Sequence, residues 1–223
     1  MEIEWRPRSA PLFRDRRHAG ALLAERLGGY RGKDALVLGI PRGGMPVAAE
    51  VARHLDADLD VVVARKLGAP GALELAIGAV TANGGRFLNE ELIAELEISE
   101  AYLKIVTAKE MAEAQAREER FRGPYSAGQA EGRTAVVVDD GLATGATMRA
   151  AVRSVRQKQP ARLVVAVPVG SREACRALRA EADEVVCLAE PEPFFAVGLY
   201  YQHFDPTEDA EVQEILEAHG RAV

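Results

Sequence analysis

Two adjacent carboxylates, Asp139 and Asp140, stand between a short apolar run and a turn that contains glycine and threonine. The run, residues 134–138, reads TAVVV, which is typical of a parallel strand covered on both faces. An ionised aspartate only accepts hydrogen bonds. An adjacent pair therefore suits two vicinal hydroxyls, or a magnesium ion held through its waters.

The turn that follows, residues 141–147, leads into a helical pattern whose apolar face is formed by Met148, Ala151, Val152 and Val155. Backbone N–H groups at such a helix start attract phosphate. Ligands of open α/β sheets bind at the carboxyl ends of the strands. The block therefore predicts a site for ribose 5-phosphate, with the acids on the hydroxyls and the turn on the phosphate.

A second candidate anion site follows another apolar run and reads GIPRGG over residues 39–44. Its glycines permit close approach of a ligand to the backbone, and the Arg42 guanidinium matches phosphate oxygens. After a further apolar run come Arg65 and Lys66, which are suited to a diphosphate, and then a mobile-looking loop at residues 69–71. Glu74 beyond it is a candidate general acid or base, or a solvated glutamate.

Short runs rich in Val, Leu and Ile predict strands at residues 35–40, 59–64, 134–138, 163–167 and 184–189. Helical patterns lie at residues 19–27, at 47–55 behind Pro46, and at 172–180. This alternation predicts an α/β fold with a mainly parallel, doubly wound sheet.

Residues 89–122 carry no strand signal, only helix formers, with Asn89 and Ser99 as candidate caps. We expect a helical insertion at about 89–122 within a single domain spanning 1–223. Residues 193–204 hold half of the six phenylalanines, and aromatic rings can stack on a planar heterocycle or pack in the core. A small C-terminal hood is expected at about 190–223.

The block DDGLATGAT resembles the PRPP-binding motif of the type I phosphoribosyltransferases, in which an acidic pair after four apolar residues precedes a turn of the form ATGGT. The resemblance implies catalysis by Asp139, Asp140 and Lys66, with Mg²⁺ held by the two aspartates through water. The substrate-binding residues that it implies are Arg42, Gly43, Gly44, Arg65, Ala143, Thr144, Gly145, Ala146, Thr147 and Phe195.

Three further features follow from the same resemblance. The RGG loop is similar to the pyrophosphate-binding loop, whose non-proline cis peptide we place at Arg42–Gly43. Phe195 matches the phenylalanine that covers the purine in hypoxanthine phosphoribosyltransferases. Those enzymes have an aspartate in the turn where this chain has Ala143, so a mechanism that relies on that acid is unavailable and the base stays open.

The 223 residues have a formal net charge of −6, which argues against an extended nucleic-acid surface. No apolar run approaches a membrane span and no signal peptide is evident, so a cytoplasmic protein without membrane partners is expected. The two cysteines, Cys175 and Cys187, are interpreted as reduced core residues without a metal site. By resemblance, the partners are PRPP, a heterocyclic base and a second copy in a homodimer.

Three alternatives stay open. The fold could serve as a non-catalytic sensor of PRPP or nucleotides that regulates a partner. A phosphate-ester hydrolase or phosphotransferase with Asp139 as nucleophile fits less well. A receiver domain also places an aspartate pair after a strand, but near the N-terminus, whereas here the pair lies past mid-chain.

Overall fold

A five-stranded, wholly parallel sheet forms the centre of the computed structural model, which describes residues 11–125 and 127–219. Its strand order is β2-β1-β6-β7-β8. The strands are β1 (Ala35–Gly39), β2 (Asp58–Val61), β6 (Thr134–Val138), β7 (Arg162–Val169) and β8 (Glu184–Ala189). The α/β class and the parallel sheet expected from the sequence are confirmed.

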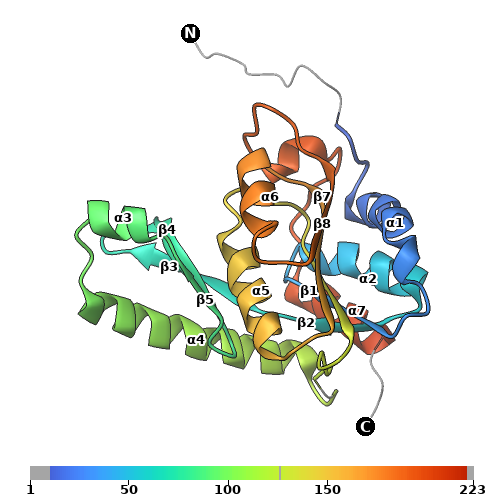
Figure 1. Ribbon diagram of the computed structural model, residues 1–223, viewed down its shortest axis with the longest axis horizontal. Coiled ribbons are helices and arrows are strands. Elements are labelled where there is room, and N and C mark those ends of the chain that lie inside the picture. Colours follow the sequence, from blue (N-terminus) through green and yellow to red (C-terminus); the bar gives the residue numbers. More distant parts are fainter. Residues whose placement is uncertain (1–10, 126, 220–223) are drawn as a thin grey trace.

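Helices cover both faces of this sheet because successive side chains of each strand point to opposite sides. Val136 and Val138 of β6 pack with α1 (Arg16–Arg26), α2 (Gly44–Leu55) and α7 (Asp209–His219). Ala135 and Val137 pack with α5 (Ala146–Gln157) and α6 (Arg172–Leu178). Figure 1 shows these two layers on either side of the sheet. The continuous apolar run at 134–138 therefore reflects burial on both faces.

A second, antiparallel sheet in the order β3-β4-β5 lies beside this body. It consists of β3 (Ala64–Ala69), β4 (Ala72–Thr81) and β5 (Arg86–Leu88). The expectation of a mobile loop after the second strand is wrong, because Pro70 and Gly71 form the short turn of a hairpin and Glu74 lies on β4. The expected strand at 59–64 is likewise divided between β2 and β3, which belong to different sheets.

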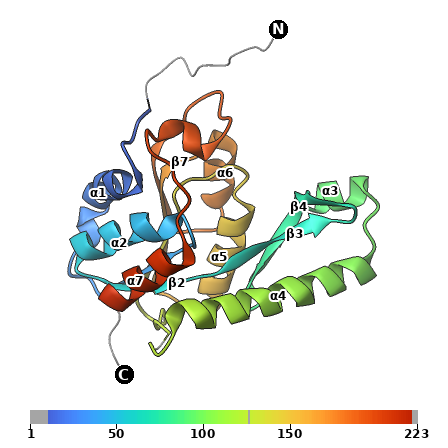
Figure 2. The same ribbon diagram turned by 180° about the vertical axis from the view of Figure 1, so that it is seen from behind.

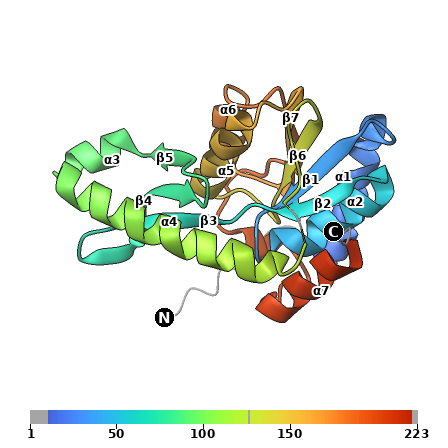
Figure 3. The ribbon, with the colours of Figure 1, turned by 90° about the horizontal axis from the view of Figure 1, so that it is seen from below.

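The expected helical pair is present as α3 (Glu90–Glu95) and α4 (Glu100–Arg122). Asn89 accepts from the N–H of Leu92, and Ser99 from that of Tyr102, so both predicted caps are confirmed. The helices share a small core with the second sheet that includes Leu67 and Ile77. We call residues 64–122 the arm; Figures 2 and 3 show it extending away from the body along α4.

The arm joins the body at two places. Ala146 and Ala150 of α5 pack with Ala79 and Phe87 of the arm sheet. Phe121, near the end of α4, is buried in the core of the body. Helix α5 therefore contacts both the main sheet and the arm.

The chain after β8 returns across the edge of the sheet before it reaches α7. The short helix η2 (Val197–Tyr200) precedes a bridge between Tyr201 and Phe13, while α7 packs on α2 and α4. The other short helix is η1 (Gly28–Tyr30), after α1. The last residues of the predicted hood, 220–223, lie outside the described residues. Within the described residues, we find no helix with the length and apolarity needed to cross a membrane.

Candidate active site

The acidic pair lies at the carboxyl end of β6, next to β1, where the strand order reverses direction. From β1 the chain passes to β2 on one side, and later to β6 on the other. Such a switch point leaves a crevice at the carboxyl ends of the two strands, where open α/β sheets bind ligands. The N–H of Asp140 donates to Oδ1 of Asp139 at 2.8 Å, which holds the two carboxylates in a fixed relation.

The loop after β1 lies directly against this pair. A Cβ on Gly43 would stand 2.0 Å from Oδ2 of Asp140, and one on Gly44 would stand 2.9 Å from Cα of Asp139. Only glycine fits at these distances. The structure thus brings together the two motifs that the sequence separates by about a hundred residues.

The cis peptide of this loop joins Pro41 to Arg42 and is a non-proline bond. The placement at Arg42–Gly43 is therefore wrong by one bond, because the resemblance located the loop and not the register within it. The Arg42 guanidinium lies 3.6 Å from Oε2 of Glu208 and 3.5 Å from Oδ1 of Asp209. It therefore points to the start of α7 rather than to the acidic pair.

Arg16, at the start of α1, is a site residue that nothing in the sequence distinguishes from the other basic residues near the N-terminus. Its Nε donates to Oδ2 of Asp140 at 2.8 Å, and its Nη1 donates to the carbonyl of Asp205 at 2.7 Å. The guanidinium also lies 3.9 Å from the centre of the Phe204 ring. In this ion pair both side chains are largely buried: 12 % of the Arg16 side chain and 15 % of the Asp140 side chain is exposed.

Tyr201 is a second residue of the site that the sequence does not single out. Its hydroxyl donates to the backbone carbonyl of Asp140 at 2.6 Å, and burial raises its pKa well above the usual value. Its ring packs against Phe13 and Phe204. The only signal in the sequence was its place in the aromatic segment at residues 193–204. In the structure it supports the acidic pair from the backbone side.

Both aspartates titrate above their ordinary range. Burial raises the pKa of Asp139 strongly, and the neighbouring Asp140 charge raises it further. Burial also raises the pKa of Asp140, although the hydrogen bond and charge of Arg16 oppose the shift. The pair is therefore short of positive charge, and a cation or a hydroxyl donor would stabilise its ionised form.

The turn after the pair is tied to the next loop of the sheet. Leu142 bridges to Gly170, and the Ser171 hydroxyl donates to the carbonyl of Ala143 at 2.7 Å. Gly145 has a φ of 76°, in the left-handed region, and α5 begins at the next residue. Thr144 is exposed on this turn, as an anion-binding loop requires.

An open groove of about 870 Å³ begins at this turn and runs between the body and the arm. Phe195, which is 56 % exposed, lines it together with Thr144. Phe87 and Asn89 line it from the arm, and Arg149 of α5 lies 4.0 Å from the Phe87 ring centre. The structure therefore places Phe195 and the predicted phosphate-binding turn on one cavity.

Arg65 and Lys66 are placed differently from the other predicted residues. Both lie on β3 in the arm, where Lys66 is exposed. The Arg65 side chain donates to Oε2 of Glu110 on α4 at 2.7 Å. Arg65 is thus directed toward α4, and not toward the edge of the main sheet.

A parallel, doubly wound sheet with an acidic pair, a glycine loop and a helix-start turn at its switch point defines the fold of the type I phosphoribosyltransferases. Residues 15–203 match the model of the phosphoribosyl transferase domain. The chain belongs to this family.

A curated relative from Mycobacterium tuberculosis, "Putative phosphoribosyl transferase MT0597", is 47% identical over 210 residues. The match covers 94% of this chain and 47% of the relative, so the chain spans about half the length of that protein. The crystal structure of TT1426 from Thermus thermophilus is also 47% identical, with a TM-score of 0.80 over 94% of this chain and 99% of that one.

A more distant structure shares the fold alone. It is a hypothetical protein from Neisseria gonorrhoeae, determined with bound ppGpp, which is 14% identical. Its TM-score is 0.52 over 96% of this chain and 99% of that one.

Proposed function

We propose that this phosphoribosyltransferase moves the phosphoribosyl group of PRPP to a nitrogen heterocycle, most simply a nucleobase, and releases pyrophosphate. The packing of Gly43 and Gly44 against Asp139 and Asp140 carries the proposal. It brings a loop suited to a diphosphate next to two acids suited to ribose hydroxyls.

The chemistry assigned to these residues is a displacement at C1 of the ribose. The bond from C1 to the diphosphate oxygen breaks, a bond from C1 to the base nitrogen forms, and the base gives up a proton. Asp139 and Asp140 would hold the hydroxyls and stabilise positive charge that develops on the sugar. The turn from Ala143 to Thr147 would hold the 5-phosphate.

The departing diphosphate is assigned to Arg42, Gly43, Gly44 and Lys66. In the structure Arg42 contacts Glu208 and Asp209, so it must exchange these partners to reach a diphosphate. The two contacts measure 3.6 and 3.5 Å and join partly or largely exposed side chains, so their loss costs little. Lys66 would approach from the arm.

Mg²⁺ fits the acidic pair because two adjacent carboxylates with raised pKa values offer hard oxygen ligands and lack positive charge. When bound, the ion would neutralise the diphosphate as it leaves. Arg16 already contacts one oxygen of Asp140, which leaves Asp139 and the other Asp140 oxygen for the metal or its waters.

The acceptor would lie in the groove beside Phe195, whose exposed ring can stack on a planar base. Ala143 cannot supply the acid that hypoxanthine-type enzymes have at this place in the turn. The base therefore needs another route for its proton, such as direct release to water.

The test is pyrophosphate release from PRPP and Mg²⁺ over a panel of purine, pyrimidine and other heterocyclic bases. The double variant Asp139→Asn with Asp140→Asn should lose turnover while it keeps the far-ultraviolet circular dichroism spectrum. If the double variant is as active as the wild type, the assignment of the site is wrong.

A sensor of PRPP or nucleotides is the second candidate. Two contacts favour it, because they engage groups that catalysis would use. Arg65 donates to Glu110 in the arm, and Arg16 donates to the Asp140 carboxylate. Calorimetric binding of PRPP without pyrophosphate release for any base would support the sensor. Pyrophosphate release with any base would support the transferase instead.

We also propose that the protein acts as a homodimer in the cytoplasm, without nucleic acid or membrane partners. Membership of the family supports the homodimer, and the net charge of −6 agrees with the proposal that no nucleic acid binds. Analytical ultracentrifugation at micromolar concentration should report the mass of two chains.

A further inference from the structure

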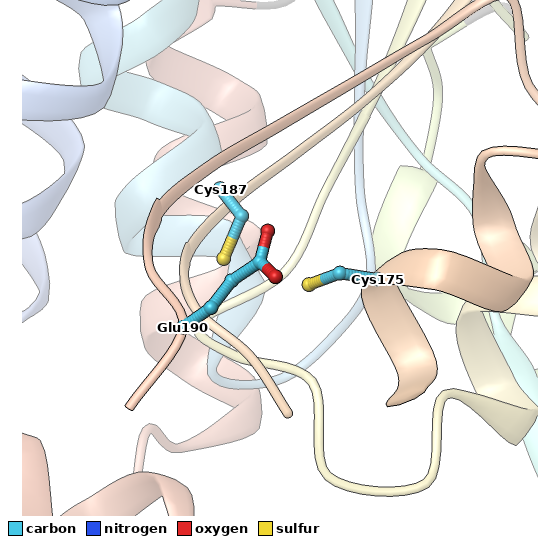
Figure 4. A group of neighbouring side chains, drawn as sticks. All are labelled: Cys175, Cys187 and Glu190. Atoms are coloured by element: carbon cyan, nitrogen blue, oxygen red, sulfur yellow. The ribbon is translucent and has the colours of Figure 1, made fainter. Parts of the chain in front are cut away.

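A group of three possible metal ligands lies next to Gly170, the residue that bridges to Leu142 in the turn proposed to bind phosphate. Cys175 of α6, Cys187 of β8 and Glu190 just after β8 point toward one another, as Figure 4 shows. Their sulfur and carboxylate oxygen atoms all lie within 4.8 Å of one another. No sequence motif marks this group, because its members come from separate elements and have no CxxC spacing.

The backbone at Gly170 packs closely against the two sulfurs. A Cβ on Gly170 would stand 2.8 Å from Sγ of Cys175 and 3.5 Å from Sγ of Cys187. A larger residue at position 170 would therefore displace the Cys175 sulfur. Cys175 is buried, while Cys187 and Glu190 are half-buried, so the group is partly accessible to solvent.

The protons and charges of the group suit a divalent cation. The Cys187 thiol donates to the backbone carbonyl of Ala189 at 3.1 Å, which holds its sulfur at the end of β8. A divalent metal ion can take the place of the two thiol protons, because both sulfurs lie within 4.8 Å of a Glu190 carboxylate oxygen. Two thiolates and the Glu190 carboxylate with a divalent ion carry a net charge of −1.

The Arg179 guanidinium can balance this remaining charge. Its Nη2 donates to Oε1 of Glu190 at 2.5 Å. A group that hydrogen-bonds to a ligating carboxylate orients it and raises the affinity of the site for the metal. The carboxylate keeps a second oxygen for the metal.

We propose that Cys175, Cys187 and Glu190 form a binding site for a thiophilic divalent cation of the Zn²⁺ class. Three protein ligands and one water complete a tetrahedral shell. Binding forms two metal–sulfur bonds and releases one proton from each thiol. The site is independent of the transferase assignment.

The position of the group gives the cation a structural role. Gly170 bridges to Leu142, and the Ser171 hydroxyl donates to the carbonyl of Ala143 in the phosphate-binding turn. A cation that joins α6 to the end of β8 would hold both sides of the Gly170 loop. It would thereby stabilise the support of that turn.

The test uses the reduced, chelator-treated protein and Zn²⁺ in competition with a chromophoric chelator. One Zn²⁺ should bind per chain, and both thiols should lose reactivity toward a thiol reagent. The chain has two cysteines, so the thiol count reports on this site alone. Co²⁺ in place of Zn²⁺ should give thiolate-to-metal charge-transfer absorption.

Variants locate the ion. Cys175→Ser and Cys187→Ser should each weaken Zn²⁺ binding by at least about 100-fold, and Arg179→Met by on the order of tenfold. Glu190→Gln should also weaken it by at least about tenfold. The matched control is Glu192→Gln, two residues on, because Glu192 pairs with Arg172 instead.

The proposal is overturned if the reduced wild type takes up no Zn²⁺ at micromolar concentration, or if uptake survives both serine changes. Loss of both thiols to a disulfide in air, with no Zn²⁺ uptake after reduction, would also overturn it. The thiol count on the wild type decides the question even if a serine variant fails to fold.

Discussion

In the candidate active site, the backbone at Gly43 lies directly against the carboxylate of Asp140. A methyl group at this position would lie 2.0 Å from Oδ2, so one of the two must move. Arg16 also lies near, with its Nε 3.1 Å from the same methyl position. A single added carbon would therefore disturb the loop proposed to bind the diphosphate, the acid and its partner together.

We expect Gly43→Ala to weaken PRPP binding by at least about tenfold, or ~1.4 kcal/mol, as measured by calorimetry with Mg²⁺. Gly28→Ala is the matched control, because a methyl group there would meet nothing within 4 Å and its φ is not positive. Equal affinity for the two variants would show that the loop does not bind the diphosphate.

The raised pKa of Asp139 has a consequence for stability. Because its pKa in the folded protein exceeds the ordinary 3.8, the folded state holds a proton that the unfolded state releases. The contribution of the protonated Asp139 carboxyl to the free energy of unfolding is fully present below pH 3.8. It is lost as the pH rises through the pKa of the folded protein. At neutral pH the buried charge therefore destabilises the fold.

Asp139→Asn should accordingly raise the free energy of unfolding at pH 7 by on the order of 1 kcal/mol. The gain should shrink as the pH falls toward about 4, where the wild-type carboxyl is protonated in the folded state. Urea denaturation over this range measures it. Asp140→Asn should stabilise less, since it takes a carboxylate away from the buried Arg16. An Asp139→Asn variant less stable than the wild type at pH 7 would contradict this account of the pair.

Among the elements, α4 decides where the arm lies, because it begins in the arm and ends in the body. Its last turn is held by a buried ion cluster in which Arg122 contacts Asp60 of β2 at 3.1 Å and Glu118 at 2.9 Å. Asp60 also accepts from the N–H of Gly128. The cluster fixes both the helix end and the loop that leads back toward β6.

Arg122→Met should cost about 3–5 kcal/mol of stability, because it leaves Asp60 and Glu118 buried without their cation. Arg120→Met, two residues earlier on the exposed side of the same helix, should change the stability by less than about 0.5 kcal/mol. Urea midpoints of the two variants give the comparison. Similar losses would mean that the cluster does not anchor the helix.

At the scale of the whole molecule, the proposed substrate would touch elements far apart in the chain. It would join the loop after β1, the end of β6 and the start of α5, and β3 of the arm would supply Lys66. A ligand that binds only the folded arrangement stabilises all of it by mass action.

PRPP with Mg²⁺ at about 100 times its dissociation constant should therefore stabilise the protein by about 2.7 kcal/mol. This corresponds to a rise of roughly 5–10 °C in Tm for a chain of this size. Differential scanning fluorimetry measures the shift. The double variant of Asp139 and Asp140 should show none, and an equal shift in it would place the ligand elsewhere.

The main sheet was largely predictable from the sequence because four of its strands are short, mostly apolar runs between helical patterns, whereas β2 carries two aspartates. The sheet of the arm was not. Strand β4 has only Ile77, Val80 and Thr81 as β-branched residues, and Gly78 interrupts it. That glycine is needed because a Cβ would stand 2.3 Å from the carbonyl of Phe87 on β5. A strand with so few β-branched residues, such as β4, is recognised only from its pairing with neighbouring strands.

The sequence by itself determined the family, through the resemblance of its acidic block to a known motif. It also determined the order of strand, acidic pair, turn and helix at residues 134–157, because this order depends on local periodicity. The tertiary structure alone decided which distant groups meet. Arg16 reaches Asp140 across 124 positions, and Cys175 meets Cys187 without any motif spacing. The physical reason is that local patterns fix the faces of an element, whereas contacts between elements depend on how those faces pack.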